Sequence, residues 1–350
     1  MIVSIDCRFI GKSGIGTYIE GVVDKFICNY PQNHYLLIVE KELDKYVNIK
    51  NVTQFCTDIQ PFTLKELFRF PVKEINKTDA FLSPYINIPF GIKIPVYTTI
   101  HDVIFWDIPE LVSKVGLWMR SFFVKHAIST SKAIFTVSKF SQNRIVHHFN
   151  TQKPIIVVPN GIAEHIRNSK EEVSKEDYVL FVGNVKQHKG LSVLVDAFQK
   201  AKAKGLTAIL KIVGNKDNFR TNDNSFLVSA LEDKDIVFTG CLSNEDLVRS
   251  IASAKVLVLP SFYEGFGIPP MEALYLGTDA IVSDIEVLKE VYSNLPVTFF
   301  KQGDSYDLSE KLLSFKKNDF EGLNIRRLIE NQYSYDITAK HIMETIKANW

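Results

Sequence analysis

The sequence lacks the features that mark several large classes of protein. Its 350 residues include only four cysteines, and no two of them are close enough in sequence to suggest a zinc site or a disulfide framework. No run of apolar residues approaches the roughly 20 that a membrane-spanning helix needs. The N-terminal residues reach Arg8 without the apolar core of a secretory signal peptide. We therefore expect a cytoplasmic protein with reduced thiols.

An excess of charge of one sign is also missing, because 41 Lys and Arg face 40 Asp and Glu. This balance gives no reason to expect a nucleic-acid partner. It is uneven along the chain, however: no acidic residue occurs between Leu111 and Ala163, whereas seven basic residues do. Such a stretch is either an ordinary solvated face or a surface that attracts a phosphorylated acceptor or an anionic membrane.

The pattern that is present is an alternation of short apolar runs with longer helical segments, which is typical of βαβ units and a parallel sheet. In the first half the predicted strands are Ile2–Ile5, Tyr35–Val39, Ala80–Leu82, Val96–Ile100, Ala133–Val137 and Ile155–Val158. The clearest helices there are Thr17–Asn29 and Val112–Thr130. The mostly polar stretch Asn160–Asp177 is the best linker candidate.

The same alternation restarts after this linker. The predicted strands are Tyr178–Val182, Ala208–Val213, Ile236–Thr239, Val256–Leu259 and Ala280–Val282, and the predicted helices are Gly190–Ala203, Glu245–Ala254, Pro270–Leu276 and Ile337–Asn349. We therefore predict two doubly wound, Rossmann-like α/β domains with a cleft between them. The first comprises residues 1–163 with a C-terminal helix 337–350 that crosses back to it, and the second comprises residues 164–336.

Ligands of such sheets bind where the carboxyl end of a strand turns into a helix, and three segments have that form. The first is the glycine-rich turn that contains Gly14 and Gly16. Glycines there let backbone amides approach a diphosphate closely, and the helix dipole adds positive potential. A glycine-rich turn is also often no more than a turn, so both interpretations stay open.

The second segment places Asn184, Lys186, His188 and Lys189 between a predicted strand and a predicted helix. Cationic side chains at a helix N-terminus oppose the helix dipole. That placement is reasonable if an anion occupies the site, and the alternative is a solvated loop.

The third segment runs from Ser261 to Glu272 after the strand that ends at Leu259. Its two prolines mark a helix start, so we expect Glu264 in the loop and Glu272 in the first turn of the helix. Both carboxylates can accept hydrogen bonds from sugar or ribose hydroxyls, and the amides near Phe266 and Gly267 can hold phosphate. Glu272 has a second interpretation as an acid that stabilises the helix dipole.

This third segment carries a family resemblance. Glu264 and Glu272, in the setting Tyr-Glu-Gly-Phe-Gly-Ile-Pro-Pro-Met-Glu-Ala, resemble the signature of the retaining family-4 glycosyltransferases. Further motifs follow in that family's order along essentially the whole chain. They are the glycine-rich loop, His101-Asp102, Val137–Ser141, Val158–Gly161 and Lys186–Lys189.

The resemblance implies the GT-B fold, with the acceptor bound mainly by the N-terminal domain and the nucleotide-sugar donor mainly by the C-terminal one. It implies that Lys189 contacts the donor diphosphate, Glu264 the transferring sugar and Glu272 the ribose. His101 corresponds to the active-site histidine of the family, although a strand-end histidine can also be merely structural. Asn184 departs from the family pattern, where arginine is common, so neutralisation of the diphosphate rests more on Lys189, with help from Lys186 or His188.

The reaction implied by the resemblance is a front-face substitution with retention, in which the leaving phosphate helps to deprotonate the acceptor. No carboxylate nucleophile is then needed. Asp233-Lys234-Asp235, the only Asp-x-Asp of the chain, precedes a predicted strand and reads as a turn, so neither a metal nor another cofactor is expected.

The expected activity is transfer of a hexose from a nucleotide-diphosphate sugar to a hydroxyl of a glycan or lipid-linked acceptor, as in assembly of cell-surface polysaccharides. Resemblance to mannosyltransferases gives a mild preference for GDP-mannose. Two alternatives stay open: a nucleotide-sugar 2-epimerase of the same fold and a non-catalytic nucleotide-sugar-binding module.

The predicted helix Val112–Thr130 also has two interpretations. Val115, Trp118 and Phe122 share one face at i, i+3 and i+7, and lysines accompany them. This is the pattern of a basic amphipathic helix that rests on the inner face of an anionic membrane. In the alternative, the aromatic stripe is buried in the N-terminal core and only the lysines contact water.

Overall fold

A computed structural model describes residues 1–169, 173–214, 230–316 and 324–349. The chain divides into two units, which are described separately: unit 1 comprises residues 1–163 and 332–350, and unit 2 comprises residues 164–331. The first boundary lies where we placed it. The C-terminal segment joins unit 1 from Gln332 onward, whereas we placed that transition at Ile337.

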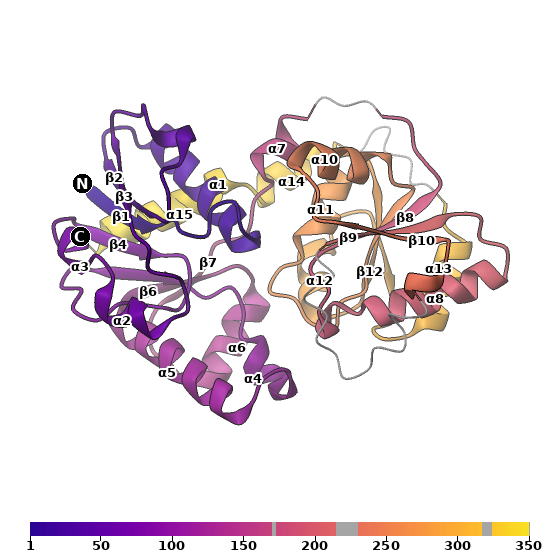
Figure 1. The fold of residues 1–350 in the computed structure, drawn as a ribbon, viewed down its shortest axis with the longest axis horizontal. Helices are drawn as coiled ribbons and strands as arrows, with labels where there is room; N and C mark the ends of the chain where they lie inside the picture. Colours follow the sequence, from indigo (N-terminus) through magenta and orange to yellow (C-terminus); the bar gives the residue numbers. More distant parts are fainter. Residues whose placement is uncertain (170–172, 215–229, 317–323, 350) are drawn as a thin grey trace. The chain divides into compact units, whose positions relative to one another are not determined.

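Unit 1 contains a seven-stranded parallel sheet in the order β3-β2-β1-β4-β5-β6-β7 (Figure 1). Its strands are β1 (Ile2–Asp6), β2 (His34–Val39), β3 (Val52–Cys56), β4 (Ala80–Ser83), β5 (Val96–Thr99), β6 (Ser131–Thr136) and β7 (Ile155–Val157). The order changes direction beside β1, which makes the sheet doubly wound, and such switch points are where ligands bind.

The helical elements of unit 1 are α1 (Gly14–Asn29), η1 (Asp44–Tyr46), α2 (Leu64–Arg69), α3 (Val72–Ile75), α4 (Ile104–Asp107), η2 (Pro109–Leu111), α5 (Lys114–Thr130), α6 (Lys139–Phe149) and α15 (Tyr335–Ala348). The C-terminal α15 packs on α1, as we predicted for the C-terminal helix. Glycines permit this packing, because a Cβ at Gly161 would lie 2.4 Å from the backbone nitrogen of Tyr335. The Val158–Gly161 motif therefore anchors the start of α15.

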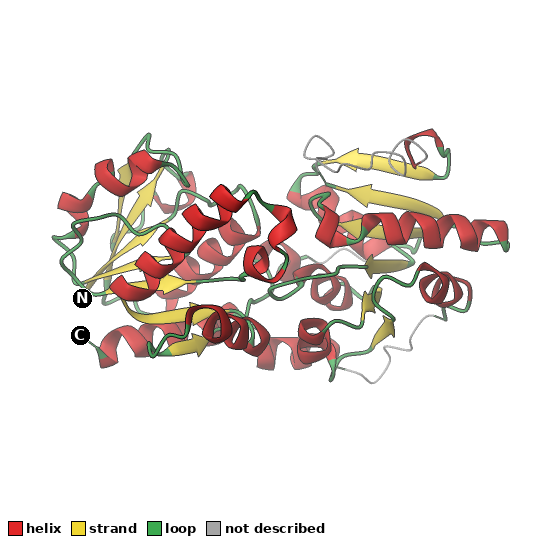
Figure 2. Ribbon diagram, turned by 90° about the horizontal axis from the view of Figure 1, so that it is seen from below, coloured by secondary structure: helices red, strands yellow, loops and turns green. Residues whose placement is uncertain are grey.

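Unit 2 contains a six-stranded parallel sheet in the order β10-β9-β8-β11-β12-β13, with helices packed against it (Figure 2). Its strands are β8 (Tyr178–Val182), β9 (Ile209–Val213), β10 (Ile236–Gly240), β11 (Val256–Leu259), β12 (Asp279–Ser283) and β13 (Val297–Phe300). Its described helical elements are α7 (Glu164–Arg167), η3 (Gln187–Lys189), α8 (Leu191–Ala203), α10 (Asn244–Ser253), α11 (Ile268–Tyr275), α12 (Glu286–Tyr292), α13 (Ser305–Leu313) and α14 (Ile325–Gln332).

The structure corrects our alternative interpretation of the segment that forms α5. The side chains of Val115, Trp118 and Phe122 are exposed, so the prediction that they are buried in the core is wrong. The buried face of α5 is instead made by Phe123, Val124, Ala127 and Ile128. These four recur at i, i+1, i+4 and i+5, which is a full apolar stripe in its own right, and it leaves the other apolar stripe facing solvent.

Candidate functional site

The centre of the candidate site in unit 2 is an ion pair between two residues that we had assigned to different parts of a ligand. The Nζ of Lys189, in η3 after β8, lies 2.8 Å from both Oε1 and Oε2 of Glu264, in the loop after β11. Ser261 donates a third hydrogen bond to Oε1 at 2.6 Å. The Glu264 side chain is only 8% exposed and that of Lys189 is 24% exposed. The pair is thus largely shielded from water, which strengthens it.

Three features of the backbone hold these loops together. Strands β8 and β11 are neighbours in the sheet, so their carboxyl ends meet at the same edge. The amide of Phe262 donates to the carbonyl oxygen of His188 at 2.8 Å. Gly190 has a φ of +66°, and a Cβ there would lie 2.0 Å from the carbonyl oxygen of Pro260. Only glycine permits this close approach, which sets Lys189 opposite Glu264.

The other basic side chains at this edge of the sheet differ in whether they carry a positive charge that can attract an anion. Burial, followed by the nearby positive charge of Lys189 and Lys186, lowers the pKa of His188 to about 4, so this histidine is neutral near pH 7. Lys186 and Asn184 are both exposed in the same loop. In this state Lys186 is the exposed positive charge of this loop, whereas the charge of Lys189 is paired with Glu264 and His188 is neutral.

Glu272 lies in α11 and is 8% exposed. Burial raises the pKa of its carboxyl group to about 7. No described residue donates a hydrogen bond to this carboxylate, so the raised pKa reflects loss of hydration alone. A buried carboxyl group with unused acceptor oxygens is suited to a ligand that brings hydroxyl donors.

The structure also corrects our placement of Glu272. Helix α11 begins at Ile268, so the two prolines lie at its second and third positions and Glu272 is beyond the first turn. Prolines are accepted there because the first amides of a helix have no intrahelical acceptor. The interpretation of Glu272 as a first-turn acid that stabilises the dipole is therefore wrong.

The turn into α11 is fixed by a tyrosine that we did not identify from the sequence. The hydroxyl of Tyr292 hydrogen-bonds the carbonyl oxygen of Gly267 and accepts from the amide of Met271 at 3.0 Å. Gly267 has a φ of +84°, and a Cβ there would lie 2.6 Å from Leu288. The ring of Phe266 is buried beside it. These contacts explain the glycine and the buried ring, whereas phosphate binding by the amides of Phe266 and Gly267 stays a prediction.

Unit 1 presents His101 after β5, as we predicted. Its Nε2 donates to the carbonyl oxygen of Pro84 at 3.0 Å, which leaves Nδ1 as an acceptor. Burial lowers the pKa of His101 to about 4, so the ring is neutral near pH 7. The ring of Tyr18 packs edge-on against it at 4.9 Å, and Ser141 donates to its backbone carbonyl at 3.1 Å.

Gly14 and Gly16 lie in the first turn of α1, whereas we predicted that they precede the helix. A Cβ at Gly16 would lie 2.0 Å from the carbonyl oxygen of Phe9, so Gly16 is required for close packing. A Cβ at Gly14 would meet no atom within 4 Å. Packing thus explains Gly16 but not Gly14, and the donor-binding role of both glycines stays a prediction.

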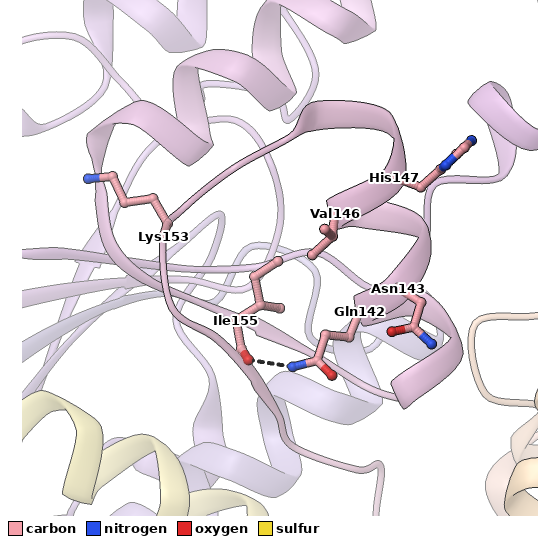
Figure 3. Close-up of a pocket in the computed structure, with 6 residues that line it drawn as sticks. All are labelled: Gln142, Asn143, Val146, His147, Lys153 and Ile155. Atoms are coloured by element: carbon pink, nitrogen blue, oxygen red, sulfur yellow. Dashed lines mark hydrogen bonds between the residues drawn. The ribbon is translucent and has the colours of Figure 1, made fainter.

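A pocket of about 350 Å³ lies away from these residues, between α6 and β7 of unit 1 (Figure 3). Its polar side chains do not converge: Lys153 and His147 point in opposite directions, and Gln142 donates to the carbonyl oxygen of Ile155 at 2.7 Å. None of our predicted site residues lines it. We therefore place no chemistry there.

The described part of the chain lacks both a metal-binding cluster and a membrane-spanning helix. No group of three or more His, Cys, Asp or Glu side chains in the described ranges is arranged to hold a metal ion. Within the same ranges, no helix combines the length and apolar character that crossing a bilayer requires.

Asp233 forms the predicted turn, since its side chain accepts from the amide of Asp235 at 2.9 Å just before β10.

Comparison with known families gives two matches that together extend over most of the chain. Residues 163–335 match the family described as glycosyl transferases group 1. Residues 72–165 match the family described as glycosyltransferase family 4.

Two curated relatives are mannosyltransferases by name. The chain is 28% identical to O-antigen chain mannosyltransferase B of Escherichia coli over 230 residues, which cover 61% of this chain and 59% of that relative. It is 27% identical to O-antigen chain mannosyltransferase RfbU of Salmonella typhimurium over 307 residues, which cover 81% and 83% of the two chains.

Solved structures with the same fold extend over nearly the whole chain. Anabaena HepE in complex with UDP and glucose superposes with a TM-score of 0.74 at 15% identity, covering 99% of this chain and all of that one. Sucrose-phosphate synthase from Thermosynechococcus elongatus gives a TM-score of 0.71 at 14% identity, covering 100% and 99%. At these identities the likeness concerns the fold alone, and that fold is GT-B.

Proposed function

This chain belongs to glycosyltransferase family 4, and we propose that it transfers a hexose, with retention of anomeric configuration, from a nucleotide-diphosphate sugar to an acceptor hydroxyl. The acceptor in this proposal is a glycan or a lipid-linked glycan of a cell-surface polysaccharide. The relatives named as O-antigen mannosyltransferases favour mannose as the sugar, and hence GDP-mannose as the donor. Its four free cysteines are compatible with a cytoplasmic location.

The observation that carries this proposal is the Lys189–Glu264 pair at the carboxyl edge of the unit 2 sheet. A donor brings an anionic diphosphate for Lys189 and sugar hydroxyls for Glu264, so one ligand can replace both halves of the pair. Glu272, a buried residue whose carboxylate accepts no hydrogen bond from any described residue, would accept from the ribose hydroxyls. The three side chains thus offer one partner each to the diphosphate, the sugar and the ribose of a nucleotide sugar.

The proposed chemistry is electrostatic. Cleavage of the glycosyl–phosphate bond builds negative charge on the departing diphosphate and positive charge on the sugar. Lys189 would stabilise the diphosphate more strongly in the transition state than in the ground state, which is how a fixed charge accelerates a reaction.

The acceptor proton would pass to the leaving phosphate, so no protein carboxylate is needed as a nucleophile. Neutral His101, with Nε2 donating to a carbonyl, would present Nδ1 as a hydrogen-bond acceptor to a sugar or acceptor hydroxyl. No step of this reaction uses a metal or another cofactor.

A panel of nucleotide sugars tests the proposal, first without an acceptor and then with a mannose-containing glycan. A transferase releases nucleoside diphosphate slowly in the first case and rapidly in the second, and the product keeps the anomeric configuration of the donor. Appearance of a new nucleotide sugar without acceptor would identify an epimerase instead. Tight donor binding with no turnover in either condition would identify a binding module.

A further inference from the structure

Unit 1 carries a continuous exposed apolar surface that its core does not use. It extends over α2, α5 and the residue Phe90 between them, and α2 and α5 lie along one side of this unit (Figure 1). We call it the aromatic-basic face. Its exposed apolar members are Leu64, Phe68, Phe90, Val115, Trp118, Met119 and Phe122.

Ring contacts join the two helices into one surface. The centroids of Phe68 and Phe90 are 5.3 Å apart, and Phe90 lies 4.7 Å from the ring of His126 on α5. His126 in turn stacks on Phe122 at 6.3 Å. The rings are nevertheless open to solvent, since Phe68 is 74% exposed and Trp118 is 71% exposed. Scattered apolar residues need no explanation, but a connected patch with a protruding tryptophan does.

Basic side chains accompany this surface and have no acidic partner. Lys65 and Arg69 on α2, and Lys114 and Lys125 on α5, are exposed and form no ion pair with any described residue. Arg120 packs over the ring of Phe105 at 4.4 Å. The acid of α2, Glu66, is buried and turned inward. From Leu111 to Ala163 the sequence contains no acid at all.

We propose that the aromatic-basic face rests on an anionic lipid bilayer. Trp118 and its neighbours would lie at the headgroup level, where amphipathic aromatic rings are favoured, and the lysines would contact lipid phosphates. Apolar burial and attraction to anionic lipid each contribute to binding of this kind. The inference deepens the proposed function and rests on it in one respect, because a lipid-linked acceptor would be presented at such a surface.

Charge complementarity is what selects a membrane as the occupant. An apolar patch that pairs with a second copy of this chain would bring the unpaired lysines and Arg69 of both copies together, and like charges in contact are unfavourable. An anionic bilayer instead neutralises all of them at once. A fluid bilayer can also accommodate the protruding side chains, whereas a protein partner would need a cavity that matches them.

Vesicle co-sedimentation of the full chain tests the proposal. The wild type should bind phosphatidylglycerol vesicles at low salt, bind pure phosphatidylcholine vesicles far more weakly, and dissociate as salt is added. Each lysine near an anionic surface contributes about 1 kcal/mol, so the double variant Lys114→Ala/Lys125→Ala should bind about thirtyfold more weakly. Trp118→Ser/Phe122→Ser should lose at least about tenfold, because it removes apolar burial.

A matched control is available on α14 of unit 2, where Arg327 and Leu328 are exposed. The variant Arg327→Ala/Leu328→Ser changes one base and one apolar side chain outside the face, and it should bind vesicles as the wild type does. Circular dichroism and thermal melting should show that all variants are folded, since every changed side chain is exposed or half-exposed.

Four results would overturn the proposal: absence of wild-type binding to phosphatidylglycerol, equal binding to both lipids, unchanged binding of the lysine variant, or weakening by the control variant. A dimer in sedimentation velocity that Trp118→Ser/Phe122→Ser dissociates, without vesicle binding, would assign the face to a second copy. Slow release of nucleoside diphosphate from the donor is measured on the same protein preparations in the absence of vesicles. A wild type that binds vesicles but releases no nucleoside diphosphate would refute the proposed function and leave the docking face intact.

Discussion

Replacing Glu272 by glutamine should stabilise unit 2 and weaken nucleotide binding at the same time. In the folded chain burial raises the pKa of this carboxyl group from 4.5 to about 7. The folded state therefore binds a proton more tightly than the unfolded state between these two values. The contribution of Glu272 to stability is complete below pH 4.5 and is lost as the pH rises through 7.

The size of this effect follows from the shift. One pKa unit corresponds to about 1.4 kcal/mol, so ionised Glu272 lowers the free energy of unfolding by about 3 kcal/mol at pH 8. An amide of the same shape carries no charge, although it keeps part of the cost of burying a polar group. We expect Glu272→Gln to gain about 1–3 kcal/mol at pH 8, or several degrees in melting temperature. The gain should vanish toward pH 4.5.

Calorimetry from pH 5 to pH 8 measures this, and Glu66→Gln provides the matched contrast. Glu66 is also a buried glutamate, but it is paired with the buried Arg8 and hydrogen-bonded by Tyr85 and Asn87. Losing one partner of a buried pair typically costs about 3 kcal/mol or more, so the same chemical change should destabilise unit 1. A Glu272→Gln protein that is less stable than the wild type at pH 8 would refute the reasoning.

Three further predictions concern binding and catalysis. Lys189→Ala should weaken binding of both the donor and the free nucleoside diphosphate by about tenfold or more. Calorimetric titration with both ligands measures this, and an unchanged affinity for the diphosphate would show that Lys189 does not contact it. The turnover number should show no ionisation near pH 6.5, because His101 has a pKa of about 4. The donor KM should rise below pH 7, because Glu272 then takes up a proton, and a wild-type KM that is independent of pH would contradict the role of Glu272. Transfer should persist in excess EDTA, and complete loss that manganese or magnesium restores would show that a metal takes part.

The fold was predictable wherever the apolar pattern was strong. Strands β8 and β11 were predicted with their observed bounds, because each is an uninterrupted apolar run in a buried parallel sheet. Strands β3 and β13 lie at sheet edges and were missed. Their residues are mostly half-exposed, and the polar Thr53 and Gln54 interrupt the first of them. Edge strands need fewer apolar side chains, so their pattern is weaker.

The site was predictable as a set of residues but not as a set of contacts. Lys189 and Glu264 are 75 positions apart and follow strands that are not consecutive in the chain. Their pairing depends on strand order, which no local pattern records. Tyr292 was missed for the same reason, because its hydroxyl reaches the start of α11 from another helix. The start of α11 was misplaced because prolines are accepted at several positions of a first helical turn.

The Lys189–Glu264 pair, which strand order brings together, also provides the most direct test of the donor site. Glu264→Gln removes the charge that holds Lys189 while keeping the shape of the side chain. Lys189 is then released for phosphate, whereas the carboxylate that would bind the transferring sugar is gone. As the partner of Lys189, Glu264 should oppose diphosphate binding, and as a ligand of the sugar it should promote transfer. The substitution should therefore not weaken diphosphate binding but should lower the transfer rate.

The measurement is the affinity for free nucleoside diphosphate together with the rate of acceptor-dependent diphosphate release, in wild type and Glu264→Gln. We predict that the variant binds the free diphosphate at least as tightly as the wild type and transfers at least about a hundredfold more slowly. A folded Glu264→Gln protein that transfers sugar at the wild-type rate would contradict the assignment of this site.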